Sequence, residues 1–276
     1  MTDPTTAVVL GVIEGITEFL PVSSTGHLLV AQQWMPRQTD LFNVVIQTGA
    51  VLAVIPLFHK RFHQFIYNWR DPAVRDYFLK IVVASFITCV GGFIMVKRGF
   101  ILPERLQPVA IALLVGGVVF LIVEWWLART GHGAGQEKEG GDLRDVTWTV
   151  AIAVGIGQLI AAGFPGASRS GTTIIFALLL GLTRPLATEY SFLVSIPTML
   201  AAGGYKIFEA FHHPKAGAPN ENWQMVILAS VVAAVVSFVA VKWLLRYVQT
   251  HTFVLFGWYR VLIGGGLLVA LAMRLI

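Results

Sequence analysis

The sequence has little charge. Only 13% of its 276 residues are charged, whereas 56% are hydrophobic, and the mean hydropathy is +0.72. A soluble domain of this length carries about 25% charged residues. The shortage of charge, together with several long apolar runs, excludes an ordinary soluble domain and predicts a polytopic membrane protein.

Cysteine is almost absent as well. The single one, Cys89, lies in an apolar run, so an intrachain disulfide is excluded and packing must hold the fold together. The first apolar run has no small-residue cleavage site after a basic region, and we expect no cleaved signal segment. The net charge of +5 comes from basic residues that cluster in connecting segments. This clustering indicates topology and headgroup contacts and argues against nucleic-acid binding.

One polar stretch interrupts the apolar sequence near the N-terminus. It reads Glu14-Gly-Ile-Thr-Glu-Phe-Leu-Pro-Val-Ser-Ser-Thr-Gly-His27 and lies between apolar residues 7–13 and 28–31. Ionisable groups at membrane depth are costly, so they predict a functional site that faces protein or water. Glu14 and Glu18 are four residues apart, which places both carboxylates on one face of a helix. Pro21 then ends that helix.

The hydroxyl residues that follow Pro21 predict a second short helix, which Ser23, Ser24 or Thr25 can cap. A helix N-terminus beside hydroxyls is an anion site, and phosphate is the obvious anion. The apolar segments on both sides of the proline are shorter than the roughly 20 residues of a spanning helix. We therefore expect a re-entrant hairpin, whose irregular backbone is tolerated where protein buries it or water lines it.

A second interrupted segment resembles the first. Its apolar residues are broken by Pro165-Gly-Ala-Ser-Arg-Ser-Gly-Thr-Thr173, and Pro165 lies 144 positions after Pro21. With one residue more of offset, 23–26 overlies 168–171. Paired interruptions in two halves are typical of inverted-repeat membrane proteins with a site near the midplane.

Three spans are expected after each interrupted segment, and an odd number requires the two halves to be inserted in opposite orientations. The expected spans are 41–58, 78–96, 107–127, 186–208, 224–245 and 253 to the C-terminus. The predicted fold is thus an all-α integral membrane protein, an inverted-topology repeat with six transmembrane helices and two re-entrant helix hairpins. It forms a single domain over 1–276, with repeat one at 1–128, a Gly-rich linker at 129–145 and repeat two at 146–276.

These residue types together predict phosphoryl transfer. The first segment supplies carboxylates for a divalent cation and hydroxyls for a nucleophile, while Arg169 in the second is a planar fork suited to phosphate. Metal, nucleophile and phosphate clamp are the parts that phosphoryl transfer requires. The structural alternative for the same set is a polar hinge of a transporter or channel.

At these two stretches the chain resembles the undecaprenyl-diphosphatase family, also called bacitracin-resistance proteins, and the resemblance covers essentially the whole length. It implies hydrolysis of the C55 polyprenyl diphosphate lipid to its monophosphate in the bacterial inner (cytoplasmic) membrane, which recycles the carrier for cell-wall synthesis. It further implies dependence on a divalent cation, Mg²⁺ or Ca²⁺, and a homodimer. A transporter or flippase of a polyprenyl phosphate lipid remains the rival from a different class.

Carried over residue by residue, the resemblance implies that Glu14 and Glu18 are the essential carboxylates and metal ligands. It implies that Ser24 is the nucleophile or its close neighbour and that His27 is a candidate acid or base. It also implies that Arg169 is the phosphate clamp. The residues leave open whether a serine or a metal-activated water attacks. Further expected phosphate-binding residues are Ser23, Thr25, Ser168, Ser170 and Thr173.

Four other polar positions stand out. Glu124, beside two tryptophans at a span end, reads as part of an interfacial belt. Glu189 lies in an apolar segment and is left open, and Gln158, like Gln47, is a candidate partner of the hairpin tips.

Basic residues favour one orientation of the chain. By the expected topology, nine lie opposite the termini: Lys60, Arg61, Arg70, Arg75, Arg129, Lys138, Arg144, Arg184 and Arg246. Seven lie with the termini: Arg37, Lys97, Arg98, Arg105, Lys206, Lys215 and Arg274. The excess predicts periplasmic termini and an active site that opens to the periplasm.

Overall fold

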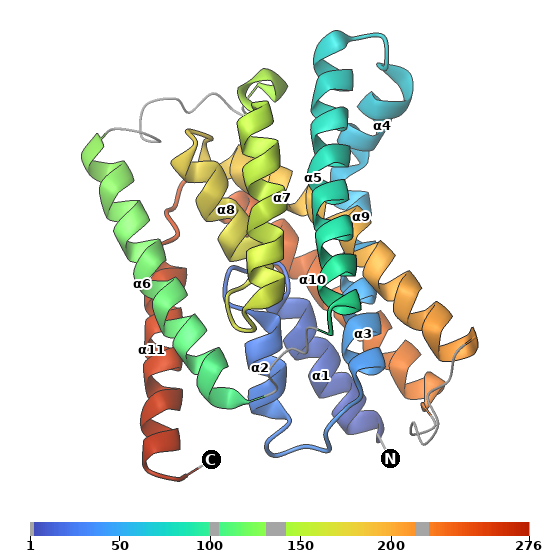
Figure 1. Ribbon diagram of the computed structural model, residues 1–276, viewed down its shortest axis with the longest axis vertical. Helices are drawn as coiled ribbons and strands as arrows, with labels where there is room; N and C mark the ends of the chain where they lie inside the picture. The colour runs from blue at the N-terminus through green and yellow to red at the C-terminus, as the bar shows by residue number, and fades with distance from the viewer. Residues whose placement is uncertain (1–2, 100–104, 131–141, 213–220, 276) are drawn as a thin grey trace.

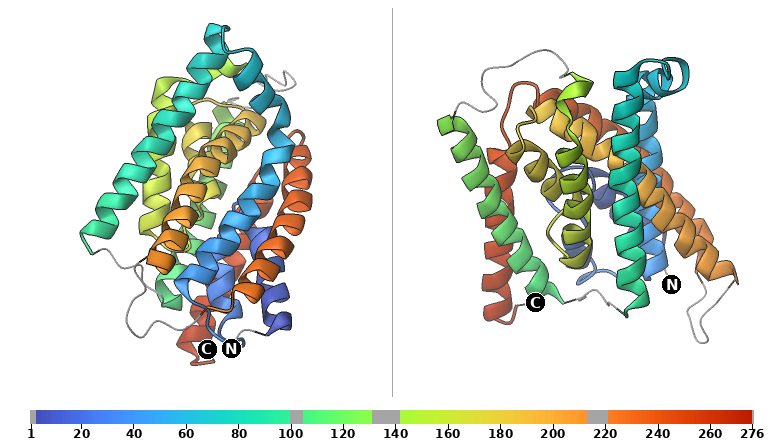
Figure 2. Two further views of the ribbon diagram at one scale, coloured as in Figure 1. Left: turned by 90° about the vertical axis from the view of Figure 1, so that its right-hand side faces the viewer. Right: turned by 45° about the horizontal axis from the view of Figure 1, so that its top comes forward.

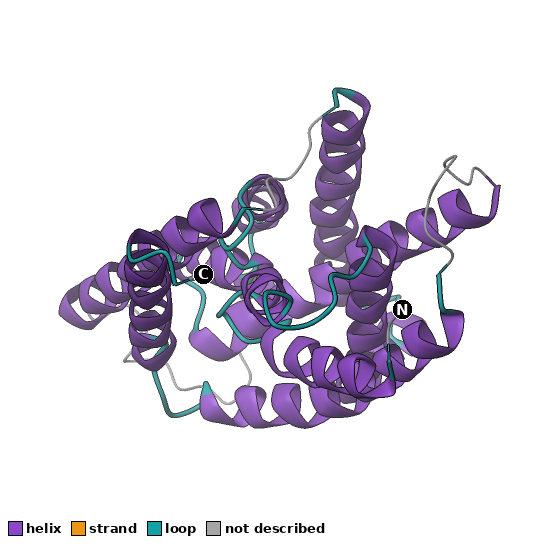
Figure 3. Cartoon of the chain, turned by 90° about the horizontal axis from the view of Figure 1, so that it is seen from below, coloured by secondary structure: helices purple, strands orange, loops and turns teal. Residues whose placement is uncertain are grey.

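The computed structural model describes residues 3–99, 105–130, 142–212 and 221–275. Within these residues the chain is helical and has no strand (Figure 3). The helices are α1 (Pro4–Thr17), α2 (Ser24–Ala31), α3 (Asp40–Val54), α4 (His59–Tyr67), α5 (Pro72–Lys97), α6 (Leu106–Thr130), α7 (Trp148–Gly163), α8 (Arg169–Leu179), α9 (Arg184–His212), α10 (Trp223–Tyr247) and α11 (Val254–Ala272), with short 3₁₀ turns at Ile55–Phe58 and Leu143–Asp145.

Six helical segments of the described chain are long and apolar enough to cross a membrane, which confirms the expected number. They are Asp40–Tyr67, Pro72–Lys97, Leu106–Thr130, Arg184–His212, Trp223–Tyr247 and Val254–Ala272. Most of the expected linker lies outside the described residues, as do two of the basic residues used for orientation, Lys138 and Lys215.

The connection after the first span differs from expectation. The expected spans 41–58 and 78–96 leave 59–77 between them as a connection, but α4 continues the first span through a 3₁₀ turn, and α5 already begins at Pro72. The side chain of Asp71 accepts a hydrogen bond from the backbone N–H of Ala73. Asp at the N-cap followed by Pro at the first helical position is a strong helix start, which explains the earlier boundary.

Two pairs of short helices approach each other from opposite ends of the molecule. The pair α1 and α2 lies at the end that carries both chain termini, and the pair α7 and α8 extends inward from the other end (Figures 1 and 2). The turns that join the members of each pair meet: Ser170 Oγ donates a hydrogen bond to the carbonyl of Leu20 at 3.2 Å. The polar stretches found in the sequence therefore lie together inside a shell of longer helices.

Glycines allow the long helices to pack closely around these pairs. A Cβ on Gly11 of α1 would lie 2.6 Å from the Ala229 carbonyl oxygen of α10, and one on Gly117 of α6 would lie 2.7 Å from the Gly257 carbonyl oxygen of α11. Small residues at such crossings let membrane helices approach without a side chain between them. The two crossings hold α10 against the first helix pair and α11 against α6.

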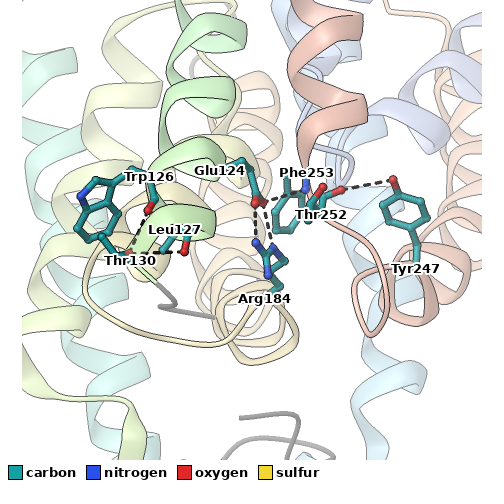
Figure 4. A network of polar contacts seen from close by, with 8 residues as sticks. All are labelled: Glu124, Trp126, Leu127, Thr130, Arg184, Tyr247, Thr252 and Phe253. Atoms are coloured by element: carbon teal, nitrogen blue, oxygen red, sulfur yellow. Dashed lines mark hydrogen bonds and ion pairs between the residues drawn. The ribbon is translucent and has the colours of Figure 1, made fainter. Parts of the chain in front are cut away.

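Glu124 is not the interfacial residue that the sequence predicted. Its side chain is only 2% exposed, and it accepts hydrogen bonds from Arg184 at 3.0 and 2.5 Å and from the backbone N–H of Phe253 at 2.9 Å (Figure 4). Burial of a carboxylate requires such partners. The ion pair therefore joins the end of α6 to the starts of α9 and α11.

Glu189, whose role the sequence left open, also joins helices through a side-chain ion pair. It accepts a hydrogen bond from Arg61 Nε at 2.6 Å and from the Tyr77 hydroxyl at 3.4 Å, which joins α4, α5 and α9. Gln158 donates to Ser195 Oγ at 3.4 Å, on α9.

Candidate active site

The first turn is built around a serine in an unusual backbone conformation. Helix α1 ends at Thr17, and Ser23 then adopts φ 73°, a region that residues other than glycine rarely occupy. Ser23 Oγ accepts a hydrogen bond from the Gly26 N–H at 3.3 Å and so caps α2. This confirms the prediction that one of the hydroxyl residues after Pro21 begins a second helix.

The second turn repeats this local geometry. Ser168 adopts φ 69°, and its Oγ accepts a hydrogen bond from the Gly171 N–H at 3.1 Å, which caps α8. Strained backbone at a non-glycine residue persists only where the surroundings hold it, and it gathers at functional sites. The correspondence between 23–26 and 168–171 in the sequence thus extends to the shape of the two turns.

A cavity of about 310 Å³ lies where the turns meet. Its lining includes several of the predicted site residues: Glu18, Ser23, Ser24, Thr25, Ser168 and Arg169. Gln47 of α3 also lines it, as does Arg37 from the segment that follows α2. Polar groups from both halves of the chain thus surround one space within an apolar helix bundle, which is where a small-molecule site is expected.

Ser24 and Glu18 are paired in this cavity. The hydroxyl of Ser24 donates a hydrogen bond to Glu18 Oε2, and both residues are buried. A hydroxyl that donates to a carboxylate has a proton acceptor already in place, which is the arrangement needed to activate a nucleophile.

Glu14 lies one helical turn before Glu18 and is fully buried. Neither of its carboxylate oxygens has a hydrogen-bond partner. Such orphaned oxygens are rare in proteins and require an explanation, of which a bound ion is one. Two carboxylates suit a hard divalent cation such as Mg²⁺ or Ca²⁺, which takes the remaining ligands from water and substrate phosphate. In the described part of the chain, no group of three or more His, Cys, Asp or Glu residues forms a complete metal site.

His27 uses both ring nitrogens in contacts with protein. Nδ1 lies 2.8 Å from the Ser23 carbonyl oxygen and Nε2 lies 2.7 Å from the Tyr259 hydroxyl. A carbonyl oxygen only accepts, so Nδ1 carries the proton and the hydroxyl of Tyr259 donates to Nε2. Ser24 donates to Glu18, and no hydrogen bond joins it to His27 among the described residues. The acid or base role of His27 stays a prediction.

Arg169 is the first residue of α8, and it lines the cavity. Its guanidinium makes no ion pair with a carboxylate within the described ranges. The other predicted hydroxyls of this segment do not line the cavity: Ser170 donates to the Leu20 carbonyl, and Thr173 donates to the Arg169 carbonyl at 2.8 Å and contacts Ser191. The structure thus brings Arg169 to the same space as Ser24, while Ser170 and Thr173 face protein.

Sequence reasoning missed Arg260. This residue of α11 is fully buried, and its guanidinium donates to carbonyl oxygens of both turns. The available signal was an arginine inside the apolar run of the last span, since a charge at membrane depth indicates a functional or structural partner.

Comparisons with known proteins place the chain in a family. Residues 7–266 match the family model described as "Bacitracin resistance protein BacA". The chain is 48% identical over 259 residues to a protein named undecaprenyl-diphosphatase from Rhizobium etli, with 94% of this chain and 93% of the relative covered. It is 49% identical over 271 residues to one of the same name from Xanthomonas euvesicatoria pv. vesicatoria, with 98% and 97% covered. The chain therefore belongs to the bacitracin resistance protein BacA family.

Proposed function

We propose that this protein hydrolyses undecaprenyl diphosphate to undecaprenyl phosphate and inorganic phosphate. The observation that carries the proposal is the hydrogen bond from Ser24 to Glu18 in a cavity that Arg169 also lines. The family and the name of its relatives support the same reaction. The reaction regenerates the monophosphate carrier lipid for cell-wall synthesis, and bacitracin resistance follows from it.

In the proposed reaction, Ser24 Oγ attacks the terminal phosphorus while its proton passes to Glu18. The bond between that phosphorus and the bridging oxygen breaks, and undecaprenyl phosphate leaves with the bridging oxygen. Water then hydrolyses the phosphoserine and restores the free hydroxyl. We assign the proton acceptor to Glu18 in preference to His27, because Glu18 already accepts the Ser24 hydrogen bond whereas both ring nitrogens of His27 are engaged elsewhere.

Arg169 binds the transferring phosphoryl group. Its planar guanidinium can donate two parallel hydrogen bonds to phosphoryl oxygens, and it makes no ion pair with a carboxylate in the described chain. Because charge on the phosphoryl oxygens must be neutralised in the transition state, such an arginine contributes to rate more than to binding.

A divalent cation completes the proposed site. Glu14, with its two unpartnered buried oxygens, and Glu18 would hold it. When bound, the cation supplies positive charge that neutralises the diphosphate. Without a cation, the neighbouring carboxylates of Glu14 and Glu18 would repel each other with only the charge of Arg169 to offset them, so removal of the metal is expected to lower stability as well as activity.

We further propose how the protein lies in the membrane. The pairs α1–α2 and α7–α8 are re-entrant hairpins of two inverted repeats, supported by their short lengths and by their approach from opposite ends (Figure 1). The slight excess of basic residues opposite the termini supports a periplasmic location for the termini and for the opening of the cavity. A homodimer is proposed on the family resemblance alone.

The experiment that tests the reaction uses the purified protein in detergent with undecaprenyl diphosphate. We expect release of inorganic phosphate in amounts that exceed the amount of protein many times over. Tight binding of the lipid without phosphate release would favour the transporter alternative, which the names of the relatives do not support.

A further inference from the structure

The guanidinium of Arg260 lies against glycines of two neighbouring helices, where a larger residue would crowd it. A Cβ on Gly116 of α6 would lie 2.0 Å from Arg260 Nη2, and one on Gly171 of α8 would lie 3.2 Å from its Nη1. The ring of Phe120 faces the guanidinium carbon at 5.9 Å. The glycines thus make room for a buried arginine. A buried charge of this kind is retained only when its hydrogen-bond donors are satisfied.

The guanidinium contacts three separate segments. Nη1 donates to the Pro21 carbonyl in the first turn at 3.2 Å, and Nη2 donates to the Gly166 and Ala167 carbonyls in the second turn at 3.1 and 3.0 Å. Nη2 and Nε also reach the carbonyls of Ala112 and Leu113 in α6, at 3.2 and 3.5 Å. Within the described residues the guanidinium thus bonds only carbonyl oxygens, and they come from both turns and from α6.

The carbonyls that Arg260 holds lie beside the reacting groups. Pro21 is three residues before Ser24, and Ala167 is two residues before Arg169. Ser23 follows Pro21 and Ser168 follows Ala167, and these serines are two of the three non-glycine residues with positive φ among the described residues. One side chain therefore fixes both strained turns with respect to each other and to α6.

We propose that Arg260 is a positioning residue that sets the distance between Ser24 and Arg169 by joining the two turns. This inference rests on the proposed phosphatase function for its effect on rate, whereas the arrangement of the turns can be measured without any reaction. Misplacing reacting groups by about 1 Å can cost roughly 100-fold in rate, so the expected kinetic effect falls on kcat.

Two kinds of substitution test the proposal. Arg260→Met removes all the hydrogen bonds, whereas Arg260→Lys keeps the charge but offers an ammonium that cannot reach all three segments. Gly116→Ala keeps the arginine and displaces its guanidinium. The matched control is Gly265→Ala in α11, where an added Cβ meets nothing within 4 Å. We expect kcat to fall about 100-fold in Arg260→Met, with less than a threefold change in KM. We expect a smaller fall in kcat in Arg260→Lys and Gly116→Ala, and an unchanged kcat in the control.

The second readout is the arrangement of the helix pairs. In a Cys89→Ser background, nitroxide labels at Gln33→Cys and Leu180→Cys report the separation of the exposed ends of α2 and α8, both outside the cavity. We expect a narrow distance distribution in the parent and in Gly265→Ala. We expect a broader or shifted one in Arg260→Met, Arg260→Lys and Gly116→Ala. All variants are compared as monodisperse detergent-purified protein.

A distribution unchanged in Gly116→Ala and Arg260→Lys would overturn the proposal, as would a wild-type kcat in variants whose distribution has changed. If Arg260→Met fails to fold, the other two variants decide. Failure of the phosphatase function itself would appear separately, as absence of turnover in the parent protein with an intact distance distribution.

Discussion

At the scale of single residues, the proposed site combines side chains from different segments. Ser24 finds its acceptor in Glu18, across the turn that contains Pro21. Arg169 reaches the same cavity from the other half of the chain. In the proposed reaction Ser24 is the reactive group, Glu18 accepts its proton and Arg169 neutralises the phosphoryl group, so conservative substitutions are expected to separate chemistry from binding.

Removal of the Ser24 hydroxyl is the first such test. Ser24→Ala should abolish phosphate release while retaining lipid binding, because the nucleophile is lost and the remaining cavity is unchanged. Thr130→Ala, which removes an exposed hydroxyl bonded to its own helix, serves as the control. Turnover and binding of a labelled lipid are measured side by side. A near-normal rate in Ser24→Ala would assign the attack to a metal-activated water.

Arg169→Lys tests the phosphate clamp. An ammonium lacks the planar fork, so it cannot grip two phosphoryl oxygens at once. We expect kcat to fall on the order of 10³-fold, about 4 kcal/mol of transition-state stabilisation, with a smaller change in KM. Arg129→Lys, at an exposed position over the ring of Trp125, is the matched control. Wild-type kcat in Arg169→Lys would mean that this arginine is structural.

At the scale of elements, each of the two polar turns contains strained backbone. Gly166 adopts φ +95°, and a Cβ there would lie 2.6 Å from the Val109 carbonyl oxygen. Gly181 has a similar φ of +92°, but an added Cβ would meet nothing within 4 Å. Substitution of Gly181 therefore introduces backbone strain alone, whereas substitution of Gly166 adds the displacement of a turn.

Gly166→Ala should therefore lower thermal stability in detergent and strongly reduce turnover, because it adds a clash with α6 to a strain of about 1–2 kcal/mol. Gly181→Ala should show the strain alone, with turnover close to that of the parent. Thermal unfolding and phosphate release measured for both variants decide this. Equal turnover in the two variants would contradict a requirement for close contact between the second turn and α6.

Prediction from sequence succeeded where a local pattern carries the information. Long apolar runs gave the six spans, and Pro21 and Pro165 with their following hydroxyls gave the two short-helix pairs. It failed where the partner is distant in sequence. Glu124 stands beside two tryptophans and was therefore predicted to be interfacial. It is buried, and its hydrogen-bond partner Arg184 lies 60 positions away in the sequence.

Arg260 shows the same limit in a stronger form. Its acceptors are backbone carbonyls, and any residue type supplies a carbonyl, so no sequence motif marks them. The roles of Ser24 and Arg169 could be proposed from the sequence, because a hydroxyl and a guanidinium each have a recognisable chemistry, and these roles stay predictions. Local spacing favours a pair of Ser24 with His27, three residues later in the same short helix. Glu18 lies on the other side of the proline turn, so its hydrogen bond with Ser24 is visible only in the fold.

At the scale of the whole molecule, both termini lie at one end (Figures 1 and 2), and orientation is the property to test. With periplasmic termini, a C-terminal alkaline phosphatase fusion should be active, because that reporter works only in the periplasm. A fusion at exposed Trp69, in the connection between α4 and α5 at the other end, should be inactive. The reverse pattern would place the cavity opening on the cytoplasmic side.

The most direct test of the proposed chemistry compares the parent protein with Glu18→Gln, purified in detergent, for phosphate release from undecaprenyl diphosphate with and without added divalent cation. We predict cation-dependent turnover in the parent, its loss in EDTA, and no turnover in Glu18→Gln, because the amide neither accepts the Ser24 proton nor carries the charge that holds a cation. Full activity of the parent in EDTA together with normal turnover in Glu18→Gln would contradict the proposed site.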